Sequence, residues 1–280
     1  MDNLTHRLCV NLSDKPGLLA RFSSLIAENG GDISSAQHHV EGGRLYLRFI
    51  FTSKTNREEL RRVFLNAAQD TTDGARIHLT DPELPARVIV LCSREGHCLY
   101  DLLARHLAQD FRFTIPCVIS NHETHRRVVE SHGIPFYHVP SDDKVVAMRE
   151  IRRLFKEHQG DWMVLARYMQ VLDAETCQAF AGKIINIHHA FLPSFPGARP
   201  YHQAHAKGVK LVGATCHFVT SDLDDGAIIE QDIIRVDHGD SPESMMQRGR
   251  DIEVSVLARG LRGVVEERVF AAGKRTVVFR

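Results

Sequence analysis

Hydrophobic residues follow two regular spacings along residues 5–80. Stretches in which every second residue is apolar predict strands with one buried face, and stretches with apolar residues at helical spacing predict amphipathic helices. The predicted elements are strands at 7–12, 33–40, 45–51 and 76–79, with helices at 18–26 and 60–68. Their order is βαββαβ, which predicts a ferredoxin-like domain with one antiparallel sheet and two helices on one face.

The pattern changes after residues 81–86, which we interpret as a linker because Pro82 and Pro85 can continue neither a helix nor a central strand. Residues 88–92 form a continuous apolar run, which is typical of a strand buried on both faces in a parallel sheet. Strands and helices then alternate, which predicts a doubly wound, mostly parallel α/β domain over residues 87–280.

The second domain contains several separate strand patterns. The last two strands, at 211–219 and 227–236, are long and are expected to run antiparallel to each other. The predicted strands are 88–92, 113–119, 163–166, 184–187, 211–219 and 227–236.

Polar groups gather where ligands are expected, because open parallel sheets bind ligands beyond the carboxyl ends of their strands. Asn186 and His188 close one strand, and residues two apart on a strand face the same side. An amide and an imidazole supply two donors for a developing oxyanion, and a nearby carboxylate can orient the imidazole or accept a proton from water. The turn between the last two strands offers Asp222, Asp224 and Asp225. Such a set suits attack on a carbonyl carbon.

Other interpretations of these residues stay open. The histidines can form a hydrogen-bonded pair without chemistry, and the aspartates a solvated turn. Cys98 could be a thiolate nucleophile, although its apolar neighbours at helical spacing favour packing in the core. A zinc site, which no ligand signature supports, could use His188, His189, His202, His205 and Asp224.

Composition excludes several classes of protein. Lys+Arg and Asp+Glu are both 35, so the chain lacks the basic surplus of a general nucleic-acid binder. No apolar run is long enough to cross a membrane, and the start of the chain does not have the order of a signal peptide. Six scattered cysteines predict reduced thiols and a cytoplasmic protein. No glycine-rich phosphate-binding signature occurs.

Two segments resemble the active site of the folate-dependent formyl transferases, a family that includes glycinamide ribonucleotide transformylase and methionyl-tRNA formyltransferase. The first is Ile-Ile-Asn-Ile-His at 184–188 followed by Phe-Leu-Pro-Ser-Phe at 191–195, and the second is 217–226. The likeness extends over most of residues 87–280. Residues 5–80 are similar to an ACT domain, a module that often binds amino acids or mediates oligomers, and Asp-Lys-Pro-Gly-Leu-Leu at 14–19 fits its first turn.

The resemblance implies roles for individual residues. Asn186 and His188 would bind the formyl oxygen, and Asp224, which directly follows Leu223, would handle the proton. The pterin ring of the folate would lie near the backbone of one loop and near the turn that carries Asp224. These expected substrate-binding residues are Tyr168, Met169, Gln170, Val171, Leu172, Thr220 and Leu223. Gln170 stands where relatives usually have Arg.

An ACT domain before a formyl transferase-like domain is the layout of the formyltetrahydrofolate deformylase family, which the chain resembles. Residues 93–99 and 197–202 fit that family's pattern. In the transformylase a loop rich in glycine and asparagine cradles the phosphate of the acceptor. Here Arg94, His97 and Cys98 are bulky, which argues against a phosphorylated amine acceptor and leaves water as the acceptor.

The resemblance therefore implies an enzyme, a hydrolase that converts 10-formyltetrahydrofolate to formate and tetrahydrofolate. Such a reaction would balance one-carbon folate pools and supply formate for purine synthesis. It needs neither metal nor cofactor. An amino-acid effector at the ACT domain and a homo-oligomer, a dimer or tetramer, are expected, and no nucleic acid or membrane partner. The alternatives are a formyl transferase to an amine and a non-catalytic ACT-type amino-acid sensor.

Overall fold

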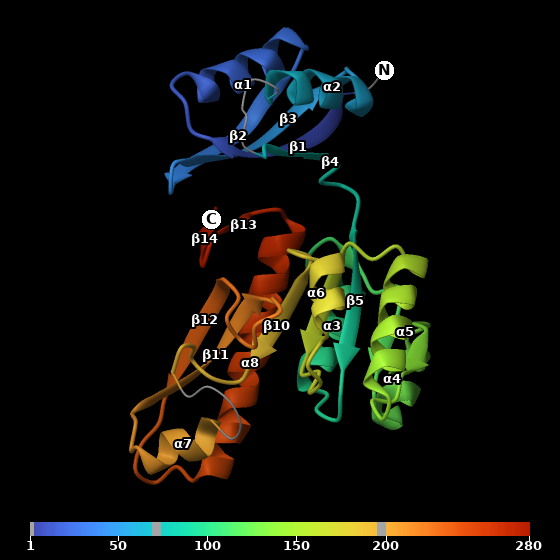
Figure 1. Cartoon of the computed structure of the whole chain (residues 1–280), viewed down its shortest axis with the longest axis vertical. Helices are drawn as coiled ribbons and strands as arrows, with labels where there is room; N and C mark the ends of the chain where they lie inside the picture. Colours follow the sequence, from blue (N-terminus) through green and yellow to red (C-terminus); the bar gives the residue numbers. More distant parts are fainter. Residues whose placement is uncertain (1–2, 69–73, 195–199) are drawn as a thin grey trace. The chain divides into compact units, whose positions relative to one another are not determined.

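The structure is a computed structural model in which residues 3–68, 74–194 and 200–280 are described (Figure 1). The chain packs into two compact units. The first unit comprises Met1–Pro85, Glu266–Ala272 and Val277–Arg280, and the second comprises Ala86–Val265 and Gly273–Thr276. Part of the stretch 87–280, which the sequence predicts as one domain, therefore packs with the first unit.

The first unit has the predicted βαββαβ order. Its strands form one antiparallel sheet in the order β2-β3-β1-β4, and α1 and α2 cover one face of that sheet (Figure 1). The alternation of apolar residues produces this arrangement, since Leu8, Val10 and Leu12 all point to the helices and are fully buried. The elements are β1 Leu4–Ser13, α1 Leu18–Glu28, β2 Asp32–Glu41, β3 Arg44–Ser53, α2 Arg57–Ala68 and β4 Arg76–Thr80.

The end of the chain forms a hairpin that the sequence analysis did not predict, β13 Val269–Ala272 with β14 Arg275–Val278. Tyr46 of β3 packs with Val277 and Phe279 in a small apolar cluster of the first unit. Glu267 accepts a hydrogen bond from the Thr80 hydroxyl at 2.7 Å. These contacts explain why the chain's last residues belong to the first unit.

The second unit is built on an eight-stranded sheet in the order β12-β11-β10-β9-β5-β7-β8, with β6 paired to β5. The strands from β10 to β8 are parallel, and β11 and β12 are antiparallel, as predicted. Its strands are β5 Ala86–Cys92, β6 Phe113–Thr114, β7 Val118–Ser120, β8 Phe136–His138, β9 Trp162–Ala166, β10 Ile184–His188, β11 Leu211–Phe218 and β12 Ile228–Arg235.

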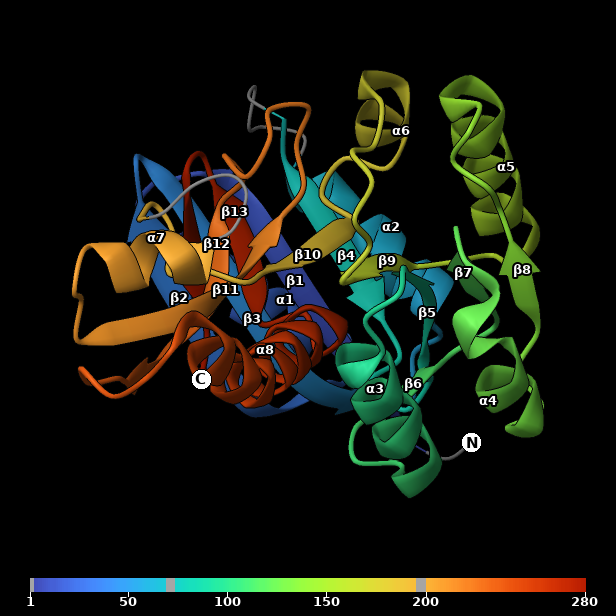
Figure 2. The same ribbon diagram turned by 90° about the horizontal axis from the view of Figure 1, so that it is seen from below.

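Helices cover both faces of this sheet, which is the expected doubly wound arrangement. Figure 2 shows α3 and α8 on one face and α5 and α6 on the other. Two helices begin at aspartates whose side chains accept from a backbone N–H of the first turn, Asp143 for α5 and Asp173 for α6. The helices are α3 His97–Ala108, α4 Arg126–Ser131 after a short 3₁₀ turn at Glu123–His125, α5 Lys144–Glu157, α6 Ala174–Ala179, α7 Pro200–Ala206 and α8 Pro242–Val265.

Three details differ from the sequence prediction. Residues 113–119 form two short strands, β6 and β7, and not one, because Pro116 lies between them and has no N–H for a sheet ladder. The short elements β8 and α7 were not predicted.

Among the described helices, none combines the length and the apolar composition that crossing a bilayer requires.

Gly226 holds the turn between β11 and β12 against the sheet. A Cβ at this position would lie 1.7 Å from the backbone oxygen of Phe218. We expect Gly226→Ala to lower the free energy of unfolding by about 1–3 kcal/mol, the usual cost of overpacking, because the obstacle is backbone. Urea unfolding measures the change. Gly239→Ala is the control, since the contact that a Cβ would meet there is the end of the Asp237 side chain at 3.2 Å and not backbone. Equal unfolding midpoints for the two variants would contradict this prediction.

Candidate active site

Strands β10 and β11 place three polar side chains on one face of the sheet. Asn186 and His188 are two residues apart on β10, and Asn186 is the cross-strand partner of His217 on β11. The Asn186 amide donates to His217 Nε2 at 3.2 Å, and His217 Nδ1 donates to the carbonyl of Phe218 at 2.8 Å. Asn186 and His188 therefore face one space, as their spacing predicts, and His217 joins them.

Asp224 completes the group from the turn between β11 and β12. Its Oδ2 lies 3.3 Å from His188 Nδ1, and its Oδ1 lies 3.6 Å from His217 Nε2. The contacts with His188, and next with His217, hold the pKa of the Asp224 carboxyl well below its usual range. Asp224 is thus a carboxylate at neutral pH.

The backbone of the turn decides which aspartate faces the histidines. Asp224 has a φ of 55°, a left-handed conformation that Asp tolerates better than most residues. Asp225 pairs with Lys274 at 2.9 Å and is exposed, and Asp222 is exposed as well. Among the three candidates, Asp224 is the one in contact with the imidazoles.

His188 presents an atom that is ready for a ligand. Its Nδ1 faces Asp224, whereas its Nε2 is buried and has no hydrogen-bond partner among the described residues. A buried polar atom without a partner costs free energy, so such atoms are expected where a ligand supplies the partner. With the Asn186 amide nearby, this geometry can stabilise negative charge that develops on a carbonyl oxygen.

His217 was missed as a site residue by the sequence analysis, although its segment was singled out. It positions both Asn186 and Asp224, and we expect His217→Ala to lower kcat by about tenfold. That factor corresponds to about 1.4 kcal/mol, within the usual cost of leaving a buried donor unpaired. Steady-state kinetics should show the loss mainly in kcat, with KM nearly unchanged. His217→Gln, whose side-chain oxygen can accept from Asn186, should recover part of the rate. A fall in KM and kcat together, without rescue by Gln, would contradict a positioning role.

Some of the residues predicted to bind the substrate have buried side chains, and others have exposed ones. Tyr168 and Leu172 follow β9 and pack into the core of the second unit. Met169, Val171 and Leu223 are 56%, 50% and 68% exposed, which is unusual for large apolar residues. Gln170 is half-buried, and Thr220 is exposed and donates to the carbonyl of Asp222 at 3.0 Å.

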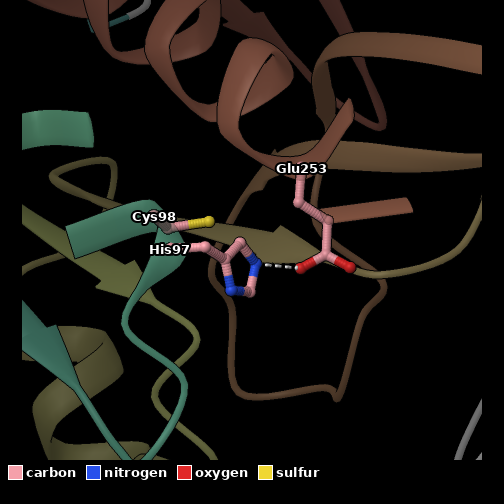
Figure 3. A group of neighbouring side chains, drawn as sticks. All are labelled: His97, Cys98 and Glu253. Atoms are coloured by element: carbon pink, nitrogen blue, oxygen red, sulfur yellow. Dashed lines mark hydrogen bonds and ion pairs between the residues drawn. The ribbon is translucent and has the colours of Figure 1, made fainter. Parts of the chain in front are cut away.

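A second polar group, here called the Glu253 cluster, consists of Glu253, His97, Arg167 and Tyr201. Glu253 on α8 is 1% exposed. Its carboxylate accepts from His97 Nε2 at 2.8 Å (Figure 3). It also accepts from the Tyr201 hydroxyl at 3.2 Å, and it lies 3.4 Å from Arg167 Nε. Burial opposes ionisation of Glu253, but the hydrogen bond from His97 and the charge of Arg167 bring its pKa below the usual value.

Cys98 lies beside this cluster, and His97, Cys98 and Glu253 form a group whose ligand atoms all lie within 4.8 Å of one another (Figure 3). Among the described residues this group is the candidate for a metal, and it includes none of the histidines proposed above for zinc. Arg167 beside the same carboxylate disfavours a cation. Cys98 is buried in the core, as expected. Burial, and next the charge of Glu253, raise the pKa of its thiol well above the usual value, so the thiol is a poor nucleophile.

Some sequence interpretations cannot be compared with the structure. The proline-rich loop that joins the two active-site segments includes Phe195, and the family-like pattern at 197–202 begins at Gly197. Both lie partly outside the described residues. His202 and His205, proposed as zinc ligands, are exposed on α7.

His189 follows His188, and its lowered pKa makes the free energy of unfolding depend on pH. Burial, and next the charge of Arg167, lower its pKa from 6.5 to about 4. Between those values the unfolded chain binds more protons, so the stabilisation from neutral His189 is complete above pH 6.5 and is lost as pH falls towards 4. We expect His189→Gln to flatten this part of the stability curve in urea unfolding. His132→Gln, at an exposed position, should leave the slope unchanged. The same slope in His189→Gln and in the unmodified chain would contradict the prediction.

Comparisons with known proteins agree with this architecture. Residues 86–261 match the formyl transferase family, and residues 6–68 match the ACT domain. A formyltetrahydrofolate deformylase of Bacillus subtilis is 41% identical over 98% of this chain and 93% of its own length. The crystal structure of a formyltetrahydrofolate deformylase from Pseudomonas syringae is 46% identical, with a TM-score of 0.95 over 99% of this chain and 94% of its own.

Formyl transferases of known structure share the fold of the second unit. A phosphoribosylglycinamide formyltransferase from Anaplasma phagocytophilum is 31% identical, with a TM-score of 0.65 over 69% of this chain and 92% of its own. The second unit is thus a formyl transferase domain. With its ACT domain and its full-length relatives, the chain belongs to the formyltetrahydrofolate deformylase family of hydrolases.

Proposed function

We propose that this protein hydrolyses 10-formyltetrahydrofolate to formate and tetrahydrofolate. The observation that carries the proposal is the pairing of His188 Nδ1 with Asp224, while the buried Nε2 of the same ring has no partner in the part of the chain that the structure describes. Neither an amine transferase nor a non-catalytic sensor is favoured, because the relatives that match over the whole chain are named deformylases.

In the proposed reaction, water attacks the formyl carbon and the carbonyl oxygen becomes an oxyanion. His188, with a proton on each ring nitrogen, donates from Nε2 to that oxygen, and Asn186 donates from its amide. The intermediate then collapses and the bond from carbon to the folate nitrogen breaks. That nitrogen takes a proton from His188, and the proton given up by the attacking water passes through Asp224 to restore His188.

Asp224 can orient the water and keep His188 protonated. Because its pKa is far below neutral pH, its carboxylate is a weak base, whereas an efficient general base has a pKa near the working pH. We therefore assign to Asp224 the positioning of water and imidazole and the relay of the proton that water loses, and to His188 the transfer of a proton to the leaving nitrogen.

The folate is proposed to lie over Met169, Val171 and Leu223. Their exposed apolar side chains would be covered by a flat aromatic ring, which is how cofactor-sized ligands are usually held. Backbone groups of 168–172 and the turn at Thr220 would provide polar contacts. Gln170 would offer an amide where relatives usually have Arg.

We also propose that the reaction needs no resident metal or cofactor, since Asn186, His188 and Asp224 supply the donors and the base that hydrolysis requires. An amino-acid effector at the ACT domain and a homo-oligomeric state stay predictions. So does a cytoplasmic location, with which the six free, buried cysteines agree.

A formate assay on purified protein tests this function. Formate and tetrahydrofolate should appear in equal amounts from 10-formyltetrahydrofolate, at a rate that neither a chelator nor an added amine changes. No formate above the uncatalysed background, or formate formation that needs added metal, would refute the proposal.

A further inference from the structure

The Glu253 cluster lies at the same end of the sheet as the reacting groups. His97 follows β5, Arg167 follows β9 and His188 ends β10, and these parallel strands are neighbours. Carboxyl ends of neighbouring parallel strands meet at one edge of a sheet, where ligands bind. The cluster therefore stands in the ligand-binding region of the second unit.

His189 and Tyr201 join the cluster to the catalytic histidine. The His188 and His189 rings have centroids 5.2 Å apart, and the His189 and Tyr201 rings have centroids 6.3 Å apart. The Tyr201 hydroxyl in turn donates to Glu253 at 3.2 Å. Three contacts thus separate the Glu253 carboxylate from His188.

The cluster is closed to ligands as it stands. Glu253 and Tyr201 are 1% and 4% exposed, and the His97 side chain is 16% exposed. Gly249, one turn before Glu253 on α8, makes room for Tyr201, because a Cβ there would lie 1.9 Å from the tyrosine hydroxyl oxygen. Figure 3 shows the His97 ring directed at the Glu253 carboxylate.

We propose that His97, held by Glu253, closes the side of the site next to His189 and so determines that water, not an amine, accepts the formyl group. The inference rests on the proposed function. Because formyl transferases share this fold, the fold alone does not choose the acceptor. The choice must come from the side chains around the reacting groups, and an acceptor larger than water needs space that His97 fills.

Glu253 fixes the position of His97. Its carboxylate is buried, accepts from His97 Nε2 at 2.8 Å and lies 3.4 Å from Arg167 Nε, so the charge of Arg167 offsets that of the carboxylate. His97 excludes the larger acceptor by its size, and Glu253 anchors His97.

The prediction concerns His97→Gly with small neutral amines as probes. In the transfer reaction the amine nitrogen bonds to the formyl carbon, the bond from that carbon to the folate nitrogen breaks, and the proton lost by the amine balances the one gained by the folate nitrogen. Glycinamide and hydroxylamine are the probes, and the ratio of formylated amine to formate is measured. We expect the ratio to rise at least tenfold over the unmodified enzyme, with hydrolysis still measurable.

Two further variants complete this test. His132→Gly, at an exposed position, should leave the ratio unchanged. Should His97→Gly fail to fold because Glu253 loses a partner, His97→Asn retains a donor in a smaller side chain and should show the same rise. A folded variant that hydrolyses the substrate with an unchanged ratio would overturn the inference. If the unmodified enzyme releases no formate, the proposed function itself fails, which is a different result.

Discussion

Asp224→Asn is expected to reduce the rate of formate release by about a thousandfold, within the usual range for loss of a group that manages a proton and equivalent to about 4 kcal/mol of transition-state stabilisation. The substitution keeps the size of the side chain but removes the charge that orients water and His188. Asn also tolerates the left-handed backbone at this position, so the turn should keep its conformation.

Asp225→Asn is the matched control for this prediction. It lies in the same turn, and the same chemical change is made, but its carboxylate pairs with exposed Lys274 and not with the histidines. Its rate should stay within about twofold, since exposed ion pairs contribute little. A normal rate in Asp224→Asn, or an equal loss in both variants, would refute the role given to Asp224.

His188→Ala is expected to lose about 100–1000-fold in kcat, because it removes one of the two oxyanion donors and the proton carrier. It also removes the first cause of the lowered pKa of Asp224, so that pKa should rise towards its usual range. Kinetics at several pH values, with a thermal unfolding check, measure both effects.

His106→Ala controls for the loss of a histidine at a distance from the site, where Nδ1 contacts the carbonyl of Phe113. Its kcat should be close to that of the unmodified enzyme. If His188→Ala folds and keeps more than a tenth of the activity, the oxyanion assignment is wrong.

The strand patterns predicted much of this site. Alternation along β10 was enough to place Asn186 and His188 on one side, because the side-chain period of a strand is fixed. The choice of Asp224 among three aspartates rested on family likeness. The left-handed φ that turns it inward is a property of the folded turn, which composition does not reveal.

His217 and Glu253 show what the patterns left out. His217 faces Asn186 only because of the register between β10 and β11, and a sequence does not state its register. Glu253 did carry a signal. It occupies the apolar stripe of α8, one turn from buried Gly249 and Leu257, and a carboxylate in that place needs buried partners. Those partners, His97, Arg167 and Tyr201, come from three other segments.

Hydrolysis in water enriched with oxygen-18 tests the central claim most directly, because it identifies the atom that attacks the formyl carbon. In a single turnover, the account predicts one solvent oxygen in each formate formed by the unmodified enzyme, and almost no formate over the same time with Asp224→Asn. Formate that carries no solvent label, or labelled formate produced equally fast by the variant, would contradict attack by water at these side chains.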